Sequence, residues 1–198
     1  MPAAPELLTP RLLLRHWHPD DLAPFAAMNA DPGVMEHFPA LMAAAESEAA
    51  ADRAEAELAS VGYGLWVLDE RATGRFLGFT GLHQVTFAAP FVTGPTVEIG
   101  WRLRRDAWGR GYAQEAARAA CDVAFGPAGL GEIVSFTATT NLRSIRVMEG
   151  IGMTHDPADD FDHPRLAPGH RLRRHVLYRL SPAANPRFHA KLGLSGAP

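Results

Sequence analysis

The feature that most constrains this chain is a pair of glycines one residue apart, set between a predicted strand and a predicted helix. The stretch Trp-Gly-Arg-Gly-Tyr-Ala spans residues 108–113, after a strand-like segment at 97–103 and before an alanine-rich, helix-like segment at 112–125. Such a turn directs backbone N–H groups towards one point at the helix N-terminus, where the helix dipole favours an anion. The sequence therefore indicates a phosphate site here, flanked by Arg105 and Arg110.

The turn alone does not separate a phosphate site from an ordinary strand-to-helix connection. It lacks the third glycine of a dinucleotide fingerprint, because Gln114 stands at that position. A second motif, Asn-Leu-Arg-Ser-Ile-Arg-Val-Met-Glu-Gly-Ile-Gly-Met at residues 141–153, reads as a short helix that ends at Gly150 or Gly152 and leads into a strand. The two motifs in this order are more informative than either one alone.

Together the motifs resemble the GNAT superfamily of acetyl-CoA-dependent N-acetyltransferases, and within it the branch that includes the ribosomal-protein alanine N-acetyltransferases. The family's cofactor loop, Gln/Arg-x-x-Gly-x-Gly/Ala, is matched at Gly111 and Ala113, but Trp108 replaces the usual Gln or Arg. The branch's Asn-x-x-Ser-x-x-x-x-Glu-x-x-Gly-Phe pattern is matched except for its last residue, which is Met; the matching positions are Asn141, Ser144, Glu149 and Gly152. The resemblance covers about residues 8–180.

The order of predicted elements favours an α/β or α+β fold. Alternation predicts about seven strands, near residues 9–15, 63–69, 75–84, 96–103, 132–139, 152–155 and 172–180. About four helices are predicted, near residues 19–30, 46–60, 112–125 and 141–150, and a loop is predicted at 156–170. Asp20 or Asp21 is the expected cap of the first helix. We expect one domain over 1–198, with a core at 8–180 and a tail at 181–198. The resemblance implies a mostly antiparallel mixed sheet whose central parallel pair splays at one end.

Composition excludes several classes of function. The net charge of −3 gives no basic excess, so we expect no nucleic-acid or membrane partner. No apolar run reaches the ~20 residues of a membrane span, and the N-terminus shows no signal peptide. A single Cys, Cys121, fits a reducing cytoplasm and is expected to pack in the core. No ligand spacing for a metal is present, so we expect none; a homodimer is one option for the assembly.

The resemblance implies acetyl-CoA as co-substrate, with its pantetheine arm in the gap between the splayed strands and its pyrophosphate at the glycine turn. Backbone groups of residues 99–103 are expected to bond that arm, and Asn141 to bond a pantetheine amide, although Asn141 also suits a helix N-cap. The expected cofactor-binding residues are Ile99, Gly100, Trp101, Arg102, Leu103, Trp108, Gly109, Arg110, Gly111, Tyr112, Ala113, Asn141 and Ser144.

Acetyl transfer to an amine requires a base for the amine and a proton for the leaving thiolate. Glu98 is our candidate base, because it is the only acidic residue of its strand and the family often places a Glu there; the alternative is an outward-facing strand residue. Where much of the superfamily has a Tyr as acid, this chain has Met148, which cannot donate. In the ribosomal-protein branch, a Ser on this helix is proposed as the acid instead, and Ser144 matches its position. The alternative role of Ser144 is helix capping. The backbone N–H of Ile99 or a neighbour is the expected oxyanion donor.

The expected acceptor is a primary amine, on a protein N-terminus or a small molecule, near Phe38, His83 and Glu98. Other histidines are weaker candidates for the base: His163, His170 and His175. Acidic residues at 159–162 hint at a cationic acceptor, although loop acids are usually only solvated. The alternative function is a non-catalytic sensor or scaffold module of the same fold that binds acyl-CoA.

Overall fold

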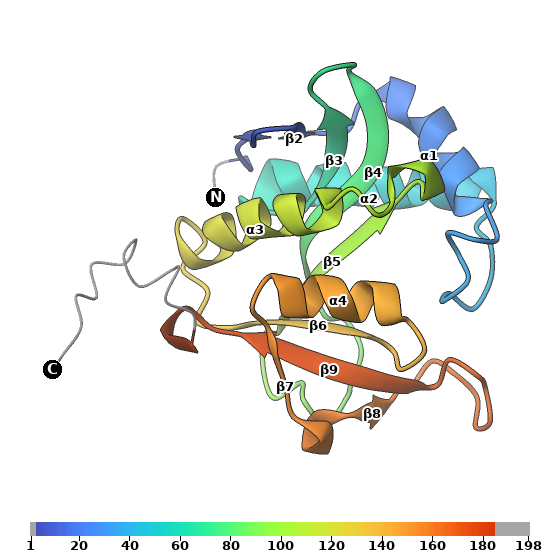
Figure 1. Ribbon diagram of the computed structural model, residues 1–198, viewed down its shortest axis with the longest axis vertical. Helices are drawn as coiled ribbons and strands as arrows, with labels where there is room; N and C mark the ends of the chain where they lie inside the picture. Colours follow the sequence, from blue (N-terminus) through green and yellow to red (C-terminus); the bar gives the residue numbers. More distant parts are fainter. Residues whose placement is uncertain (1–2, 185–198) are drawn as a thin grey trace, which may run out of the picture.

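The computed structural model describes residues 3–184 of the 198-residue chain and shows a mixed α/β fold. Four helices accompany one nine-stranded sheet in this part of the chain (Figure 1). The helices are α1 (Leu22–Asn29), α2 (Ala44–Val61), α3 (Tyr112–Phe125) and α4 (Leu142–Gly150). The strands are β1 (Leu7–Leu8), β2 (Leu12–Arg15), β3 (Leu65–Glu70), β4 (Arg75–Gln84), β5 (Val97–Leu103), β6 (Ile133–Ala138), β7 (Thr154–His155), β8 (Phe161–Asp162) and β9 (Arg174–Leu180).

The expected fold class is confirmed, and the additional strands are short. β1 and β8 have two residues each, which is too few for an alternating pattern to register in the sequence. β8 pairs with β9, inside the segment 156–170 that the sequence predicts as a loop. The tail that we expect at 181–198 begins with a 3₁₀ turn, η4 (Pro182–Ala184), and its remainder lies outside the described residues.

The strands are ordered β1-β2-β3-β4-β5-β6-β9-β7 in the sheet, and only β5 and β6 run parallel among these described pairs. β5 pairs with β4 along its whole length, from Val97 to Leu103. With β6 it has one register pair, between Glu98 and Val134, so the two strands part beyond that point. The sheet is therefore open in its middle, in agreement with the splay that the family resemblance implies.

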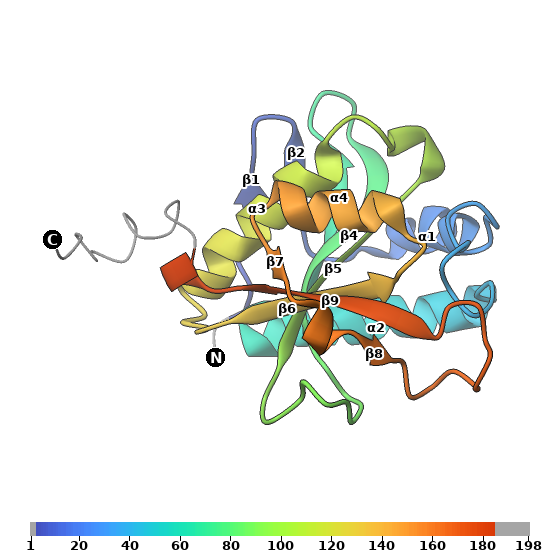
Figure 2. The same cartoon turned by 60° about the horizontal axis from the view of Figure 1, so that its bottom comes forward.

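Helix α3 makes the crossover between the parallel strands, and its small residues let it lie close to the sheet. Ala116, Ala117, Ala120 and Ala124 are fully buried in the core, together with Cys121. Figure 2 shows α3 and α4 on one side of the sheet, while α2 crosses the other side. The gap between β5 and β6 thus opens between two helical layers.

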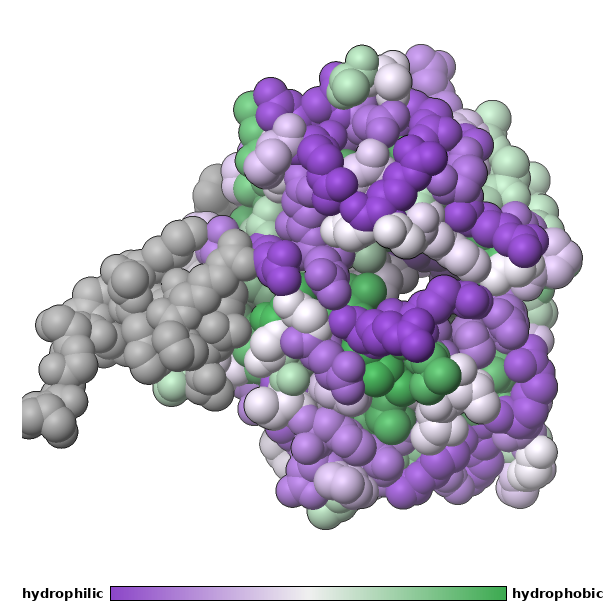
Figure 3. All heavy atoms as spheres, viewed as in Figure 1, coloured by the Kyte–Doolittle hydropathy of each residue, from purple (hydrophilic) through white to green (hydrophobic). Residues whose placement is uncertain are grey.

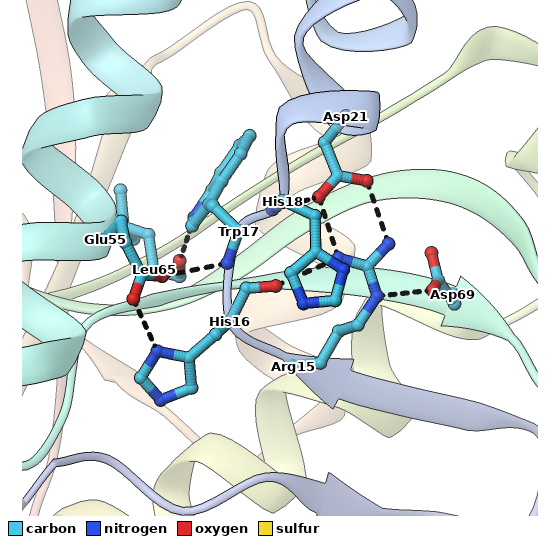
Figure 4. A network of polar contacts seen from close by, with 8 residues as sticks. All are labelled: Arg15, His16, Trp17, His18, Asp21, Glu55, Leu65 and Asp69. Atoms are coloured by element: carbon cyan, nitrogen blue, oxygen red, sulfur yellow. Dashed lines mark hydrogen bonds and ion pairs between the residues drawn. The ribbon is translucent and has the colours of Figure 1, made fainter.

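A buried ion network joins α1 to the sheet (Figure 4). The Arg15 guanidinium donates to both carboxylate oxygens of Asp21 at 2.7 and 2.8 Å, and to Asp69 at 2.6 Å. Asp21 also accepts from the backbone N–H of His18, just before the 3₁₀ turn η1 (Pro19–Asp21) that leads into α1. The sequence interpretation of Asp20 or Asp21 as the cap of α1 is therefore incomplete, because the carboxylate of Asp21 is directed to Arg15 of β2.

Candidate functional site

A cavity of about 1050 Å³ lies where the sheet is open. It is lined by β5, the N-terminus of α3, one side of α4 and the connection between α1 and α2. In the space-filling view a hollow with a mainly hydrophilic rim lies between the half of the molecule that carries α1–α3 and the half that carries α4 (Figure 3). The two sequence motifs meet at this cavity.

The glycine turn has the backbone geometry of an anion site. Gly109 and Gly111 have φ angles of 72° and 78°, a region that other residues rarely adopt. A Cβ placed on Gly109 would meet nothing within 4 Å, so the turn leaves open space beside the backbone. Among the described residues no side chain caps α3, and its first N–H groups are therefore available to an anion such as a pyrophosphate.

The N-terminal strand region supports this turn from outside the cavity. Arg11 donates through Nη1 to the carbonyl oxygen of Arg110 at 2.8 Å, and its guanidinium lies 4.6 Å above the Tyr112 ring. Glu115, in the first turn of α3, accepts from the backbone N–H and the side chain of Arg11. These contacts fix the turn without occupying the space that a ligand would need.

Most of the expected cofactor-binding residues line the cavity. They are Gly100, Trp101, Arg102, Leu103, Trp108, Gly109, Gly111, Tyr112, Ala113, Asn141 and Ser144. Arg110 and Ile99 are not among its lining residues: Arg110 is exposed, and the Ile99 side chain is fully buried in the core. The role expected of Ile99 concerns its backbone N–H and does not depend on that side chain.

Trp108, the departure from the family loop, holds an arginine beside the cavity. Its indole N–H donates to the carbonyl oxygen of Leu103 at 2.9 Å, and the guanidinium of Arg143 lies 4.5 Å above its ring. Arg143 and Arg146, on α4, line the cavity although we did not select them from the sequence. The signal was available, because their spacing of three places them on one face of the predicted helix.

Glu98 sits at the only register pair of the two parallel strands, and its carboxyl group is shielded from water. Its side chain is 13% exposed, and its Oε2 lies 3.3 Å from Nε2 of His83 on the adjacent strand β4. Burial raises the pKa of Glu98 well above the ordinary range, and burial also lowers the pKa of His83. The site thus places a proton-accepting carboxyl next to a neutral imidazole, and both residues line the cavity.

Asn141 and Ser144 are brought together at the start of α4. The Asn141 side chain accepts from the backbone N–H of Ser144 at 3.2 Å and donates to Thr137 Oγ1 at 2.9 Å. Asn141 therefore caps the helix, as one of the two interpretations expected. The hydroxyl of Ser144 has no hydrogen-bond partner among residues 3–184 and lines the cavity, while Met148 is fully buried.

The wall towards α1 carries a cation between aromatic rings. The guanidinium of Arg102 lies 4.0 Å from the ring centre of Phe38 and 5.5 Å from that of Phe79. Its Nη1 donates to Asn29 Oδ1 at 2.6 Å and lies 3.5 Å from the sulfur of Met42. Phe38 thus lines the cavity as expected, and it packs against the side chain of Arg102. The sequence suggests only the backbone of Arg102 as part of the site.

The opposite end of the cavity is aromatic. Phe87, Phe136, His163 and His175 line it, and the His163 ring lies 4.7 Å from Phe87 and 5.0 Å from His175. Burial, with His175 and Arg165 nearby, lowers the pKa of His163 to about 4. His170 is not among the lining residues, and its Nδ1 accepts from the backbone N–H of Leu172.

The acidic residues at 159–162 do not supply free negative charge to the cavity. Asp159 pairs with Arg179 at 2.7 Å, Asp160 with His155 at 2.7 Å, and Asp162 with Arg173 at 3.0 Å. Their suggested role in holding a cationic acceptor therefore loses its basis. In residues 3–184 no cluster of His, Cys, Asp and Glu suits a metal ion, and none of the described helices is long and apolar enough to cross a membrane.

Comparison with known sequences gives one consistent family. Residues 11–154 match the family model described as an acetyltransferase (GNAT) domain. YkkB from Bacillus subtilis, an uncharacterized protein, is 34% identical over 154 residues, which is 77% of this chain and 87% of that one. The FsC-acetyl coenzyme A-N(2)-transacetylase of Aspergillus fumigatus is 42% identical over 97 residues, which is 48% of this chain and 40% of that protein.

Solved structures share the fold at lower identity. A ribosomal-protein-S5-alanine acetyltransferase from Vibrio fischeri has a TM-score of 0.70 at 14% identity, over 89% of this chain and 96% of that one. The yncA structure from Salmonella typhimurium, determined with its cofactor acetyl-CoA, has a TM-score of 0.65 at 17% identity, over 89% of this chain and 95% of that one. At these identities the likeness is one of fold.

Proposed function

Because the chain belongs to the acetyl-CoA-dependent GNAT acetyltransferase family, we propose that it transfers the acetyl group to a primary amine, on a protein N-terminus or a small molecule, by direct attack. The observation that carries this proposal is the carboxyl of Glu98, shielded from water at the point where β5 and β6 part and facing the cavity. The name of the Aspergillus relative, an N(2)-transacetylase, adds support for a nitrogen acceptor.

Acetyl-CoA supplies the thioester, and residues of both motifs suit its binding. The N-terminus of α3, which no side chain caps among the described residues, suits the pyrophosphate, because Gly109 and Gly111 have positive φ angles and carry no side chain. The backbone of β5 beyond Glu98 has no strand partner on the β6 side, so its polar groups are available to the pantetheine arm. Arg143 and Arg146 add positive charge on the α4 side of the cavity.

The proposed chemistry uses two side chains. The carboxylate of Glu98 accepts the proton of the attacking amine, whose nitrogen forms the new bond to the thioester carbonyl carbon. A backbone N–H of β5, that of Ile99 or a neighbour, stabilises the negative charge that develops on the carbonyl oxygen. As the carbon–sulfur bond breaks, the hydroxyl of Ser144 gives a proton to the thiolate and regains one from solvent, to which Glu98 releases the proton that it took from the amine. The Ser144 hydroxyl has no hydrogen-bond partner within residues 3–184.

A raised pKa suits a base that must accept a proton and release it again near neutral pH. Burial gives Glu98 this property, and the lowered pKa of His83 keeps the neighbouring imidazole neutral, so the carboxylate is not neutralised by an ion pair. His83 Nε2, 3.3 Å away, is placed to orient the carboxyl.

Thermal unfolding with and without ligand tests the first part of the proposal. A ligand at 100 times its Kd stabilises the folded state by ~2.7 kcal/mol, which in a chain of this size raises Tm by roughly 5–10 °C. We expect this shift with acetyl-CoA and CoA, and none with NAD or ATP. No shift at millimolar acetyl-CoA would exclude the function. Release of CoA in an amine screen then separates an enzyme from a module that only binds acyl-CoA.

A further inference from the structure

Arg102 is a cation in the wall of the cavity without an anion to balance it. Among the described residues no carboxylate lies within ion-pair distance of its guanidinium, although eleven described ion pairs involve an arginine. Its Nε is buried and has no hydrogen-bond partner within residues 3–184. A buried charge is costly unless it is paired, so this arrangement calls for an explanation.

The neighbours of Arg102 hold it in place but leave its charge unbalanced. Nη1 donates to the amide oxygen of Asn29, and the amide nitrogen of Asn29 donates to Ser47 Oγ at 3.0 Å, so the orientation of Asn29 is fixed. Asn29 and Ser47 are both fully buried. An aspartate at position 29 would neutralise the guanidinium, whereas the neutral amide orients it and leaves its charge for another partner.

The charge of the cavity as a whole favours an anion. Glu98 is the only acidic residue that lines it within residues 3–184, and burial raises the pKa of Glu98. Four arginines line the same cavity: Arg102, Arg143, Arg146 and Arg165. Of these, only Arg143 forms an ion pair among the described residues, with Glu36 at 2.8 Å. Burial lowers the pKa of Arg102 to about 10, which is the effect expected of a cation that lacks a counter-ion.

Arg102 also lies on the face of β5 that carries the proposed base. Residues 98, 100 and 102 alternate onto one face, and Cα atoms four residues apart in a strand are separated by about 13 Å. Gly100 stands between the other two, and a Cβ placed on it would meet only His83 Nε2, at 3.9 Å. The strand therefore leaves an open trough between the carboxyl of Glu98 and the guanidinium of Arg102.

We propose that the acceptor is an amine that also carries a carboxylate, with its amine at Glu98 and its carboxylate paired with Arg102. This inference rests on the proposed function, because it concerns the acceptor of the same reaction. The guanidinium presents N–H groups in a planar fork that matches a carboxylate, and a charge-assisted hydrogen bond gains strength where water is excluded. Arg102 acts here as a specificity residue and takes no part in the proton transfers.

The test compares amines that differ only in the carboxylate. The probes are the ω-amino acids from glycine to aminooctanoate. Each is compared with the n-alkylamine and with the ω-amino amide of the same length. A short peptide with an amidated C-terminus is added as a protein-like acceptor. CoA release gives kcat/KM for each probe. We expect at least one ω-amino acid to exceed both of its partners by about 10- to 100-fold, as a charged hydrogen bond would provide.

The variant Arg102→Gln should abolish that preference and leave the affinity for acetyl-CoA unchanged. Gln keeps a donor for Asn29, and a cooperative thermal transition checks that the variant folds. Arg53→Gln removes one positive charge from the exposed surface of α2, outside the cavity, and should keep the preference. The comparison of probes on the unaltered protein tests the inference even without a variant.

Three results would overturn the inference while the proposed function survives. The first is that alkylamines or amides react as well as the amino acids at every length. The second is a preference that persists in Arg102→Gln, and the third is an Arg102→Gln variant that loses affinity for acetyl-CoA instead. The last result would assign Arg102 to the co-substrate. Failure to acetylate any amine, the peptide included, would overturn both proposals together.

Discussion

Replacing Glu98 by Gln is the sharpest test of the proposed chemistry. The two side chains have nearly the same shape, but the amide cannot accept the proton of an amine. The carboxyl is only 13% exposed, so water has little access to take its place as the base. We therefore expect the variant to bind acetyl-CoA normally and to lose turnover.

The expected loss follows from the role of a positioned base. General-base catalysis contributes ~10²–10⁴-fold, which corresponds to a rise of about 2.7–5.4 kcal/mol in the activation free energy. A base with a raised pKa also predicts that kcat/KM falls as the pH is lowered through that pKa, because the carboxylate becomes protonated. This acidic limb should be absent from the residual activity of Glu98→Gln.

The same group predicts a change in stability with pH. Its pKa is raised in the folded protein, so the folded state holds this proton more tightly than the unfolded chain does. Its contribution to the free energy of unfolding is complete below the ordinary pKa of Glu and is lost as the pH rises through the raised value. Glu98→Gln removes this dependence, and urea titrations at several pH values would measure the difference.

The assay combines CoA release over a range of pH with a thermal shift by acetyl-CoA. Glu57→Gln is the matched control: Glu57 also has a pKa raised by burial, but it lies on α2 outside the cavity, and its replacement should leave kcat/KM unchanged. A loss of less than tenfold in Glu98→Gln, or an acidic limb that persists in it, would refute the assignment of Glu98 as the base.

Three further predictions concern other parts of the molecule. Ser144→Ala keeps the backbone N–H that Asn141 caps, so we expect kcat to fall by about tenfold or more at unchanged Tm; an unchanged kcat, measured by CoA release, would remove Ser144 from the mechanism. Asp21→Ala breaks its pairing with Arg15 and should cost about 3 kcal/mol, a fall in Tm of roughly 6–12 °C by calorimetry; a change below two degrees would contradict it. Because the pKa of His163 is lowered to about 4, the free energy of unfolding should fall as pH drops from 6.5 towards 4, and His163→Gln should flatten that slope in urea titrations.

The sequence predicts the long elements of this fold well. α3 begins and ends where the glycine turn and Gly126 place it, and β4 has the predicted bounds of 75–84. Both have a clear boundary signal: a turn on each side of an alternating run, or glycine at a helix end. The two-residue strands β1 and β8 are set by pairing with distant strands, which leaves no periodic signal in the chain itself.

The candidate site is predicted less completely, for a similar reason. Motifs locate Glu98 and Ser144, since each lies in a segment with its own pattern, and both line the cavity. The contact between Arg102 and Asn29 joins residues 73 positions apart, and no local pattern announces it. The aromatic end of the cavity likewise combines four segments, which contribute Phe87, Phe136, His163 and His175. Their side chains meet only because the sheet brings their strands and loops together.

The opening between β5 and β6 also bears on how this protein avoids strand pairing with other molecules. β5 lies in the middle of the sheet, but beyond Glu98 its side towards β6 has no register pair among the described residues. In its hydrogen bonding, that part of β5 resembles an edge strand. Exposed edges at the margin of a sheet invite pairing with strands of other molecules. Here the unpaired edge is enclosed, because β6 continues the same sheet and α3 and α4 lie over the two strands (Figure 2). The chain therefore keeps a row of free backbone groups for a small, extended ligand and denies it to another polypeptide strand.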